Sequence, residues 1–395
     1  MIKSYVITVS EIDEPKDAVA EVREKLADVK LLKNTVGIVS VHAEYFQSGV
    51  YGAVADCLPF ELAGISTTSL SANGDAGTYM FSILILTSDD CRFSCGHTDS
   101  LAEGDDVFPA VKKCYGDLRE RLGEQPKLAL MYAPLMATHI PGEYMGAIAE
   151  IDPKVPIFGA VANSGQTMDE ILSYCRVLCG NEILYPAVAF VLIAGEFTPE
   201  FFVGSLTEDA VIMPNVGEIT KANKNVLVEI NGVKSADFFE KIGFGSEGGT
   251  SAGLLTSTFI LDFNKKPAYG QGVVSRAPLM IDGENGILCA GSLHEGAILS
   301  VAFSTPDVVI QTANGVIEKI KEKEDISAVL IYSCIGRRLG LMSEHMKEIE
   351  SVNDNMPEGV NYTLCYVSGE LCPIAVAPEK AYNHEHNQTI IACAF

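Results

Sequence analysis

The sequence lacks the long apolar run that a membrane-spanning helix needs, and it has few basic residues for its length. No stretch of about 18 uninterrupted apolar residues occurs in the 395-residue chain. Its 28 lysines and arginines are outnumbered by 52 aspartates and glutamates, which gives a net charge of −24. An exterior of this charge repels phosphate backbones and anionic membrane surfaces. We therefore expect neither nucleic acid nor a membrane as a partner.

A secretory signal and a disulfide framework are also missing. The first residues, Met1 to Ile7, run directly into a strand pattern, so we expect a cytoplasmic protein. Eleven cysteines are an odd number, and without a signal they predict reduced thiols. Cys91/Cys95 and Cys175/Cys179 each enclose three residues, but no second pair stands at the distance of a zinc site. We expect most cysteines to be small buried side chains.

The composition, 48% hydrophobic and 20% charged, predicts a globular chain long enough for two ordinary cores. Strand and helix patterns alternate, which is typical of α/β layers. Helical spacing with suitable starts predicts helices beginning at Pro15 and Pro306 and helices over 110–122 and 142–151. The continuous apolar runs 36–41 and 328–332 predict buried strands.

Short β-type runs predict antiparallel pairing as well. The runs 79–87 and 92–97, joined by Ser88-Asp89-Asp90, are expected to pair with each other. The runs between 177 and 213 predict a meander, and 219–221 with 226–230 predict a hairpin. We place a domain boundary before this hairpin, giving domains 1–215 and 216–395. The expected fold is α/β to α+β, with two fused domains of mixed, largely antiparallel sheets flanked by helices.

The glycine-rich segment 243–253 matches the spacing G-x-G-x-x-G. A dinucleotide-binding loop must follow a strand and open a helix, whereas this segment follows a helical pattern and leads into β-branched residues. We therefore interpret it as a surface loop rather than a cofactor site.

Chemistry-bearing residues gather after the predicted strand 328–332. Ser333, Cys334, Gly336 and Arg337 would place backbone amides, a thiol and a guanidinium at a sheet edge, where ligands of α/β proteins bind. Arg337 could clamp a carboxylate with two hydrogen bonds. Together with Glu370 and the polar tail 384–389, these residues predict a pocket for a zwitterion.

Each of these residues also has a structural interpretation. Arg337 could pair with an acidic neighbour, Cys334 could be a packed thiol, and Glu370 could cap a turn. His384 and His386 alternate, so they could hold a metal together with Glu370, although a solvated tail is the more frequent outcome. The amide of Asn387 could satisfy backbone groups at a turn.

The same residues carry a resemblance to a known family. The elements Ser333-Cys334-Ile335-Gly336-Arg337, Gly369-Glu370 with Pro373, and His386-Asn387-Gln388-Thr389 resemble the C-terminal FIST domain in order and spacing. Further similar elements are Asn231-Gly232, Ser275-Arg276-Ala277-Pro278-Leu279 and Gly291 to Gly296.

The first half resembles the N-terminal FIST domain through 62–68 and 156–163. Two positions depart from the family pattern. Ile65 and Ser69-Leu70 stand where the family has glycine-cysteine-serine/threonine followed by glycine-glutamate, and Asn163 replaces an aspartate. If Ser69 and Asn163 face the ligand, its identity differs from that bound by typical members.

The resemblance implies a sensory module that binds a small polar ligand, for example an amino acid, without turnover. No output module is visible, so a signal would pass to a separate signalling protein or through self-association. We predict no cofactor, and the ligand-binding residues that we predict are Asn163, Arg276, Ser333, Cys334, Gly336, Arg337, Gly369, Glu370, His386 and Asn387.

Two alternatives stay open. Some FIST proteins are haem-binding sensors of nitric oxide, and His139, His294 or His386 could supply an axial ligand. A hydrolase or transferase could instead use Cys334 as its nucleophile.

Overall fold

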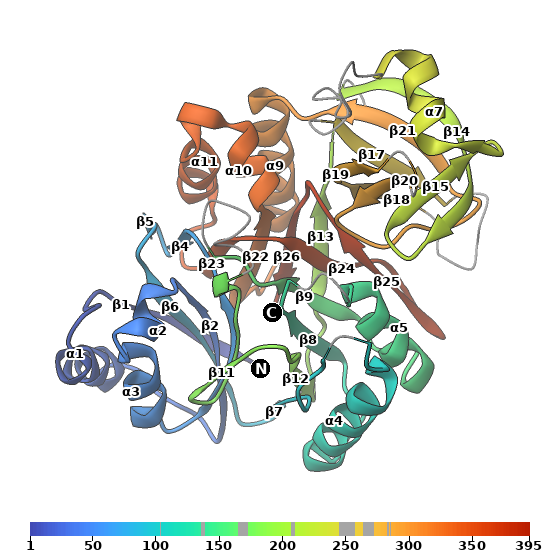
Figure 1. Ribbon diagram of the computed structural model, residues 1–395. Helices are drawn as coiled ribbons and strands as arrows, with labels where there is room; N and C mark the ends of the chain where they lie inside the picture. The colour runs from blue at the N-terminus through green and yellow to red at the C-terminus, as the bar shows by residue number, and fades with distance from the viewer. Residues whose placement is uncertain are drawn as a thin grey trace.

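The chain folds around three six-stranded sheets and carries a fourth, eight-stranded sheet at one side (Figure 1). The computed structural model describes residues 1–102, 104–135, 139–164, 173–206, 210–244, 257–263, 272–282, 284 and 286–395. The glycine-rich segment is only partly among them, because residues 245–256 lie outside the described residues. The mixed α/β architecture predicted from the sequence is confirmed.

We name the three six-stranded sheets A, B and C. The strands of sheet A, in spatial order, are β1 (Lys3–Val9), β6 (Phe81–Ser88), β2 (Asn34–Val41), β3 (Glu61–Ser66), β10 (Val177–Cys179) and β11 (Glu182–Leu184). Those of sheet C are β7 (Arg92–His97), β12 (Ala189–Ala194), β8 (Leu128–Ala133), β9 (Ile157–Val161), β24 (Gly369–Ala377) and β25 (Lys380–His386). Those of sheet B are β13 (Glu200–Gly204), β26 (Ile390–Ala394), β22 (Ala328–Cys334), β23 (Asn361–Val367), β4 (Leu70–Ala72) and β5 (Asp75–Gly77).

The three sheets share one plan. In each, the two central strands are parallel (β2 with β3, β8 with β9, β22 with β23), and every other pairing is antiparallel. Each parallel pair needs a crossover, which the helices between its strands supply. The chain therefore repeats one unit three times: strand, helix, strand, helix, strand, hairpin, strand.

The hairpin of each unit leaves its own sheet and completes a neighbouring one. The first unit gives β4–β5 to sheet B, the second gives β10–β11 to sheet A, and the third gives β24–β25 to sheet C. This cyclic exchange closes the three units around a pseudo-threefold axis. Figure 1 shows the three lobes around the centre.

Helices cover the outer faces of the sheets. Sheet A carries α1 (Pro15–Ala27), α2 (Glu44–Gln47) and α3 (Val50–Cys57). Sheet C carries α4 (Val107–Leu122) and α5 (Pro141–Ile151), and sheet B carries α9 (Pro306–Lys321), α10 (Ile335–Gly340) and α11 (Lys347–Asn355). The inner faces of all three sheets share one apolar core, to which Leu84, Leu130 and Leu330 each contribute from a different sheet.

Two positions show how tightly the parallel pairs pack. A Cβ at Gly64 would collide with the carbonyl oxygen of Val39, and one at Gly159 would collide with that of Met131. Gly64 and Gly159 each lie two residues before the end of the third strand of their units. Equivalent places in two repeats therefore demand a residue without a side chain.

The third unit contains an inserted β-rich domain between β13 and α9. Its strands are β14 (Val211–Asn223), β15 (Val226–Ile230), β16 (Val233–Lys234), β17 (Ser257–Asp262), β18 (Val273–Arg276), β19 (Pro278–Asp282), β20 (Gly286–Cys289) and β21 (Ile298–Phe303). Two short helical segments, α7 (Ser235–Phe239) and η2 (Glu240–Phe244), follow β16, and a separate apolar core includes Phe239, Phe259 and Leu299. The predicted hairpin is confirmed as β14–β15, and residue 215 lies inside β14.

Two predictions about pairing are wrong. The runs around 79–87 and 92–97 form β6 and β7, but β6 pairs with β1 and β2 in sheet A while β7 pairs with β12 in sheet C. The runs from 177 to 213 form no meander, since they contribute strands to sheets A, C and B in turn. The turn at Ser88 is real, because its hydroxyl accepts from the amides of Asp90 and Cys91 at 3.1 and 2.9 Å. It joins two units rather than two neighbouring strands.

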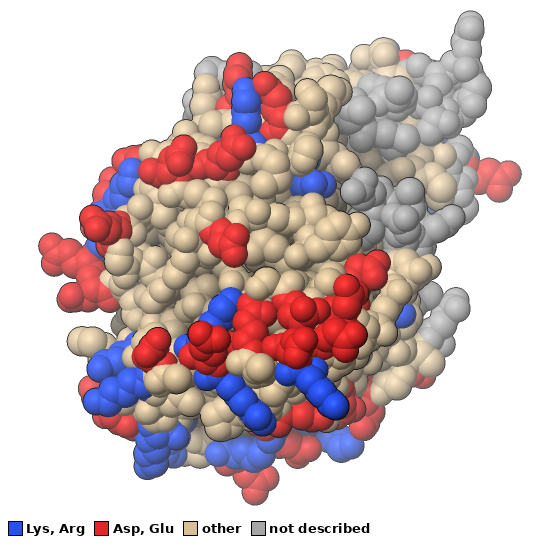
Figure 2. Space-filling view, turned by 90° about the vertical axis from the view of Figure 1, so that its left-hand side faces the viewer, with Lys and Arg blue, Asp and Glu red and all other residues tan. Residues whose placement is uncertain are grey.

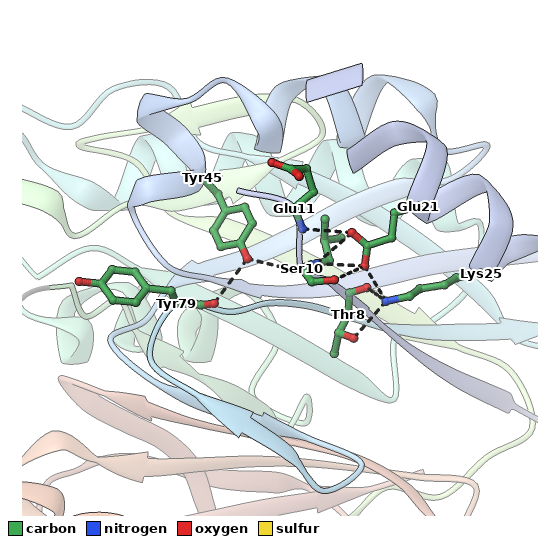
Figure 3. A network of polar contacts seen from close by, with 8 residues as sticks. Thr8, Ser10, Glu11, Glu21, Lys25, Tyr45 and Tyr79 are labelled. Carbon is green, nitrogen blue, oxygen red and sulfur yellow. Dashed lines mark hydrogen bonds and ion pairs between the residues drawn. The ribbon is translucent and has the colours of Figure 1, made fainter. Parts of the chain in front are cut away.

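A polar network holds α1 against the end of β1 (Figure 3). The carboxylate of Glu21 accepts from the amides of Ser10 and Glu11, at 3.0 and 3.1 Å, and from the Ser10 hydroxyl at 2.6 Å. Lys25 pairs with the same carboxylate at 2.7 Å and donates to the carbonyl of Thr8 at 2.6 Å. Burial raises the pKa of Glu21, but these donors outweigh it and lower the pKa to about 2.

We expect Glu21→Gln to lower the free energy of unfolding by about 1–2 kcal/mol at neutral pH, because the amide keeps the shape but loses the charge. A carboxyl with a depressed pKa stabilises the fold above its unfolded value of 4.5, and this contribution is lost as the pH falls toward about 2. Chemical denaturation between pH 7 and pH 2 measures it. Glu24→Gln, on the exposed face of α1, is the control. If the free energies of unfolding of wild type and Glu21→Gln fall in parallel between pH 7 and pH 2, groups other than Glu21 cause the loss of stability in acid.

Acidic residues gather on one face of the molecule. Figure 2 shows the side that carries α1, where acidic side chains gather into a band bordered by basic ones. The segment around α1 exposes Asp13, Glu14, Asp17 and Glu24. Among the described residues, no helix is both long and apolar enough to cross a membrane.

Candidate functional site

The ends of three equivalent strands meet where the three units converge. β3 ends at Ser66, β9 at Val161 and β23 at Val367, and each lies opposite the last residue of its parallel partner. Small or polar residues follow in every unit: Thr67-Thr68-Ser69, Ala162-Asn163-Ser164 and Ser368-Gly369-Glu370. The parallel register thus delivers three short polar segments to one place in the molecule.

Hydrogen bonds connect these segments in a ring. The amide of Asn163 donates to the carbonyl of Ser66 at 3.0 Å, and the amide of Ser368 donates to the carbonyl of Val161 at 3.0 Å. The Thr67 hydroxyl completes the ring by donating to the carbonyl of Tyr366 at 2.8 Å. Each unit is therefore bonded to the next, and the backbone around the axis is fixed.

Several buried side-chain atoms at this place have no hydrogen-bond partner within the described residues. They are Ser69 Oγ, Asn163 Oδ1, Ser368 Oγ, Glu370 Oε1 and both amide atoms of Asn387. Asn387 belongs here because a Cβ at Gly369 would lie 3.7 Å from its Nδ2. We call this group of five residues the axial site. Buried polar groups normally have partners, so such a cluster is a candidate place for a ligand or a buried water.

The Glu370 carboxyl is the ionisable member of the axial site. Its Oε2 accepts from the hydroxyl and amide of Thr389, at 2.7 and 3.3 Å. Burial raises the pKa of Glu370 to about 8, while Thr389, Arg337 and the Cys334 thiol act in the opposite direction. With one oxygen held and the other unpaired, this carboxyl is placed to receive a hydrogen-bond donor.

Cys334 lies beside the axial site as a packed thiol. It is 4% exposed, and its amide donates to the carbonyl of Thr389 at 3.0 Å. Burial and the neighbouring Glu370 carboxyl raise the pKa of this thiol. Gly336 is packed equally closely, since a side chain there would collide with that of Gln388.

Arg337 is engaged by an acidic partner that the sequence did not reveal. Its Nε and Nη2 donate to Glu348 Oε1 at 2.9 and 2.6 Å, and Nη2 also donates to the carbonyl of Val309 at 2.8 Å. Ser333 donates to the other oxygen of Glu348 at 2.9 Å, and both charged side chains are fully buried. The bidentate clamp predicted for a ligand is thus occupied by Glu348, while Nη1 has no partner among the described residues.

Arg276 and the histidines extend from the axial site toward the inserted domain. The backbone amide of Asn387 donates to the backbone carbonyl of Ser275 at 3.2 Å, which brings the next residue, Arg276, close to the axial site. Nε2 of His386 contacts the carbonyl of Cys372 at 3.0 Å, and burial lowers the pKa of this imidazole to about 3. The prediction of a solvated tail is wrong, because His384 and His386 lie in β25 and are 6% and 1% exposed. No cluster of metal-ligating side chains occurs among the residues described.

The structure therefore brings most of the predicted site residues into one region, around two foci. Asn163, Cys334, Gly369, Glu370 and Asn387 lie at or beside the axis, whereas Ser333 and Arg337 form a buried ion-pair cluster with Glu348. Sequence reasoning missed Ser368, which stands next to the predicted Gly369, and Glu348. No sequence signal pointed to Glu348, since charges on a short helix normally face solvent.

Comparisons with known proteins show which family the chain belongs to. No curated protein matches the chain. A crystal structure of cyanuric acid hydrolase from A. caulinodans is similar over 100% of this chain and 99% of that chain, with 8% identity and a TM-score of 0.36. The FIST N domain model matches residues 35–233 and the FIST C domain model matches residues 237–373. The chain therefore belongs to the FIST family, a family of sensory domains in signalling.

Proposed function

We propose that the chain is a sensor that binds a small polar molecule carrying a protonated amine, for example an amino acid, in the axial site. The observation that carries this proposal is the group of buried, unpaired polar atoms from all three units. The side-chain oxygens of Asn163, Glu370 and Asn387 can accept hydrogen bonds, and the hydroxyls of Ser69 and Ser368 can accept as well as donate. An ammonium group offers three donors and a positive charge, so it matches this arrangement.

We propose binding without turnover. Burial holds the Cys334 thiol protonated, whereas a cysteine nucleophile acts as the thiolate. Because its pKa is raised rather than lowered, Cys334 is poorly suited to the role of a nucleophile. A signal would then pass to a separate signalling protein or to another copy of the chain, in the cytoplasm.

A thermal-shift screen of the purified chain tests this function. Ethanolamine and L-alanine are expected to raise the melting temperature saturably, because a ligand that binds only the folded state stabilises it. The increase should disappear in Asn163→Ala and persist in Asn181→Ala, which changes an exposed asparagine. Haem belongs in the same screen, where a Soret band would favour a gas sensor instead. No shift with any amine would reject the proposal.

A further inference from the structure

A cavity of about 280 Å³ lies between the inserted domain and sheet C. Its walls come from α5, from β25 and from the inserted domain, which supplies Arg276 on β18 and the segment around Ser292 and His294. In Figure 1, α5, β25 and the inserted sheet lie next to one another. The volume is close to the lower end of the roughly 300–1,000 Å³ that small-molecule sites span. The cavity is separate from the axial site, whose five residues are not among those lining it.

The charged group at this cavity is Arg276, which is 0% exposed. Its Nε donates to the carbonyl of Ser292 at 2.6 Å, and its Nη1 donates to the carbonyls of Ser275 and Glu385 at 2.8 and 2.6 Å. These bonds fix the plane of the guanidinium. Nη2 has no hydrogen-bond partner within the described residues. A buried, positively charged hydrogen-bond donor held in a fixed orientation is best matched by a carboxylate acceptor.

The charged residues that line the cavity are compatible with a bound anion. Lys380 and Arg276 contribute two positive groups to the lining, against one carboxyl, Glu385. That carboxyl already accepts from the amide and hydroxyl of Ser292, at 3.3 and 3.4 Å, and burial raises its pKa, which favours the neutral form. Burial lowers the pKa of His294 to about 3, so this imidazole is uncharged at neutral pH. The cavity is therefore not dominated by negative charge.

Part of the cavity wall is apolar and leaves room. α5 presents Met145, Gly146 and Ala149 to the cavity. A Cβ at Gly146 would meet nothing within 4 Å. Such a surface suits a short aliphatic group.

We propose that this cavity is a second ligand site, independent of the axial site, and that it binds a small aliphatic carboxylate through Arg276. The two sites differ in the kind of unpaired atom that they contain, and this difference supports the proposal. Five of the six unpaired atoms of the axial site are oxygens that can accept a hydrogen bond, whereas Nη2 of Arg276 can only donate one. The site joins the inserted domain to the body of the molecule, so an occupied cavity would strengthen that contact.

Calorimetric titration of the full chain with sodium propionate tests the proposal, with sodium chloride at equal ionic strength as the reference. Wild type should bind propionate saturably. Gly146→Leu should weaken binding at least about tenfold, because its side chain fills the cavity while leucine suits a helix better than glycine. Gly315→Leu is the matched control, since Gly315 is also an exposed helical glycine with nothing within 4 Å, on α9. It should bind propionate as wild type does.

Two results would overturn the proposal. One is the absence of saturable propionate binding to wild type, and the other is equal binding to wild type and Gly146→Leu. Arg276→Gln should also lose binding, and circular dichroism shows whether this buried substitution still folds. Glu370→Gln, which alters the axial site, should leave propionate binding unchanged, so the two sites can fail separately.

Discussion

Replacing Glu348 by glutamine is expected to lower the free energy of unfolding by about 3–5 kcal/mol, because it breaks a buried ion pair by removing one partner. The substitution leaves the guanidinium of Arg337 buried without a countercharge, and it also weakens the bond from Ser333. Glu350→Gln, an exposed change on the same helix, should cost less than about 0.5 kcal/mol. Because the chain has no tryptophan, denaturation is best followed by far-UV circular dichroism.

A double replacement separates the roles of the pair. Arg337→Met with Glu348→Leu removes both charges and keeps apolar volume, so it should recover much of the stability that Glu348→Gln loses. It should also keep amine binding if Arg337 serves the fold alone. A double variant that is stable but no longer binds amines would show that Arg337 contributes to ligand binding.

The sequence predicted individual elements better than their partners. Helices beginning at Pro15 and Pro306 were correctly placed, and the strand predicted over 328–332 is β22, which runs two residues further, because propensity and periodicity are local signals. Pairing is not local in this fold. Each unit has one hairpin that crosses to a neighbouring unit: β4–β5, β10–β11 and β24–β25. The residues of such a hairpin do not indicate which sheet it joins.

A trace of the threefold repeat is nevertheless present in the sequence. Ala63-Gly64-Ile65-Ser66 and Phe158-Gly159-Ala160-Val161 end equivalent strands, and both need glycine where the neighbouring carbonyl approaches. The third unit has Cys365 at that place, judged from the register of β22 and β23. The repeat is therefore visible in two units and lost in the third, which also carries the inserted domain.

The candidate site was predicted in part for a related reason. Glu370 and Asn387 were predicted from the polar segments that hold them and from the motif resemblance, and the structure shows that both are buried with unpaired atoms. Glu348 was not predicted as a site residue because α11, which begins Lys-Glu-Ile-Glu-Ser, has the composition of a solvated helix. Only the burial of its partner Arg337 explains why this carboxylate faces inward.

Amine binding at the axial site should release close to one proton per ligand at pH 7. With a pKa of about 8, Glu370 is mostly protonated in the free protein. An ammonium group favours the ionised carboxylate, so binding expels the proton, and the affinity should rise about tenfold per pH unit from about pH 5 to 8. Calorimetry in two buffers of different ionisation enthalpy measures the proton count. Glu370→Gln should bind amines about 100-fold more weakly and release no proton.

The stability of the free protein provides an independent check on Glu370. A carboxyl whose pKa is raised from 4.5 to about 8 binds more protons in the folded state than in the unfolded state between these values. The stability that it contributes is therefore complete below about pH 4.5 and is lost as the pH rises through about 8. Glu370→Gln should flatten this decline, because the amide stays neutral throughout. If the variant and the wild type decline in parallel, Glu370 is ionised already in the free protein, and amine binding would then release no proton.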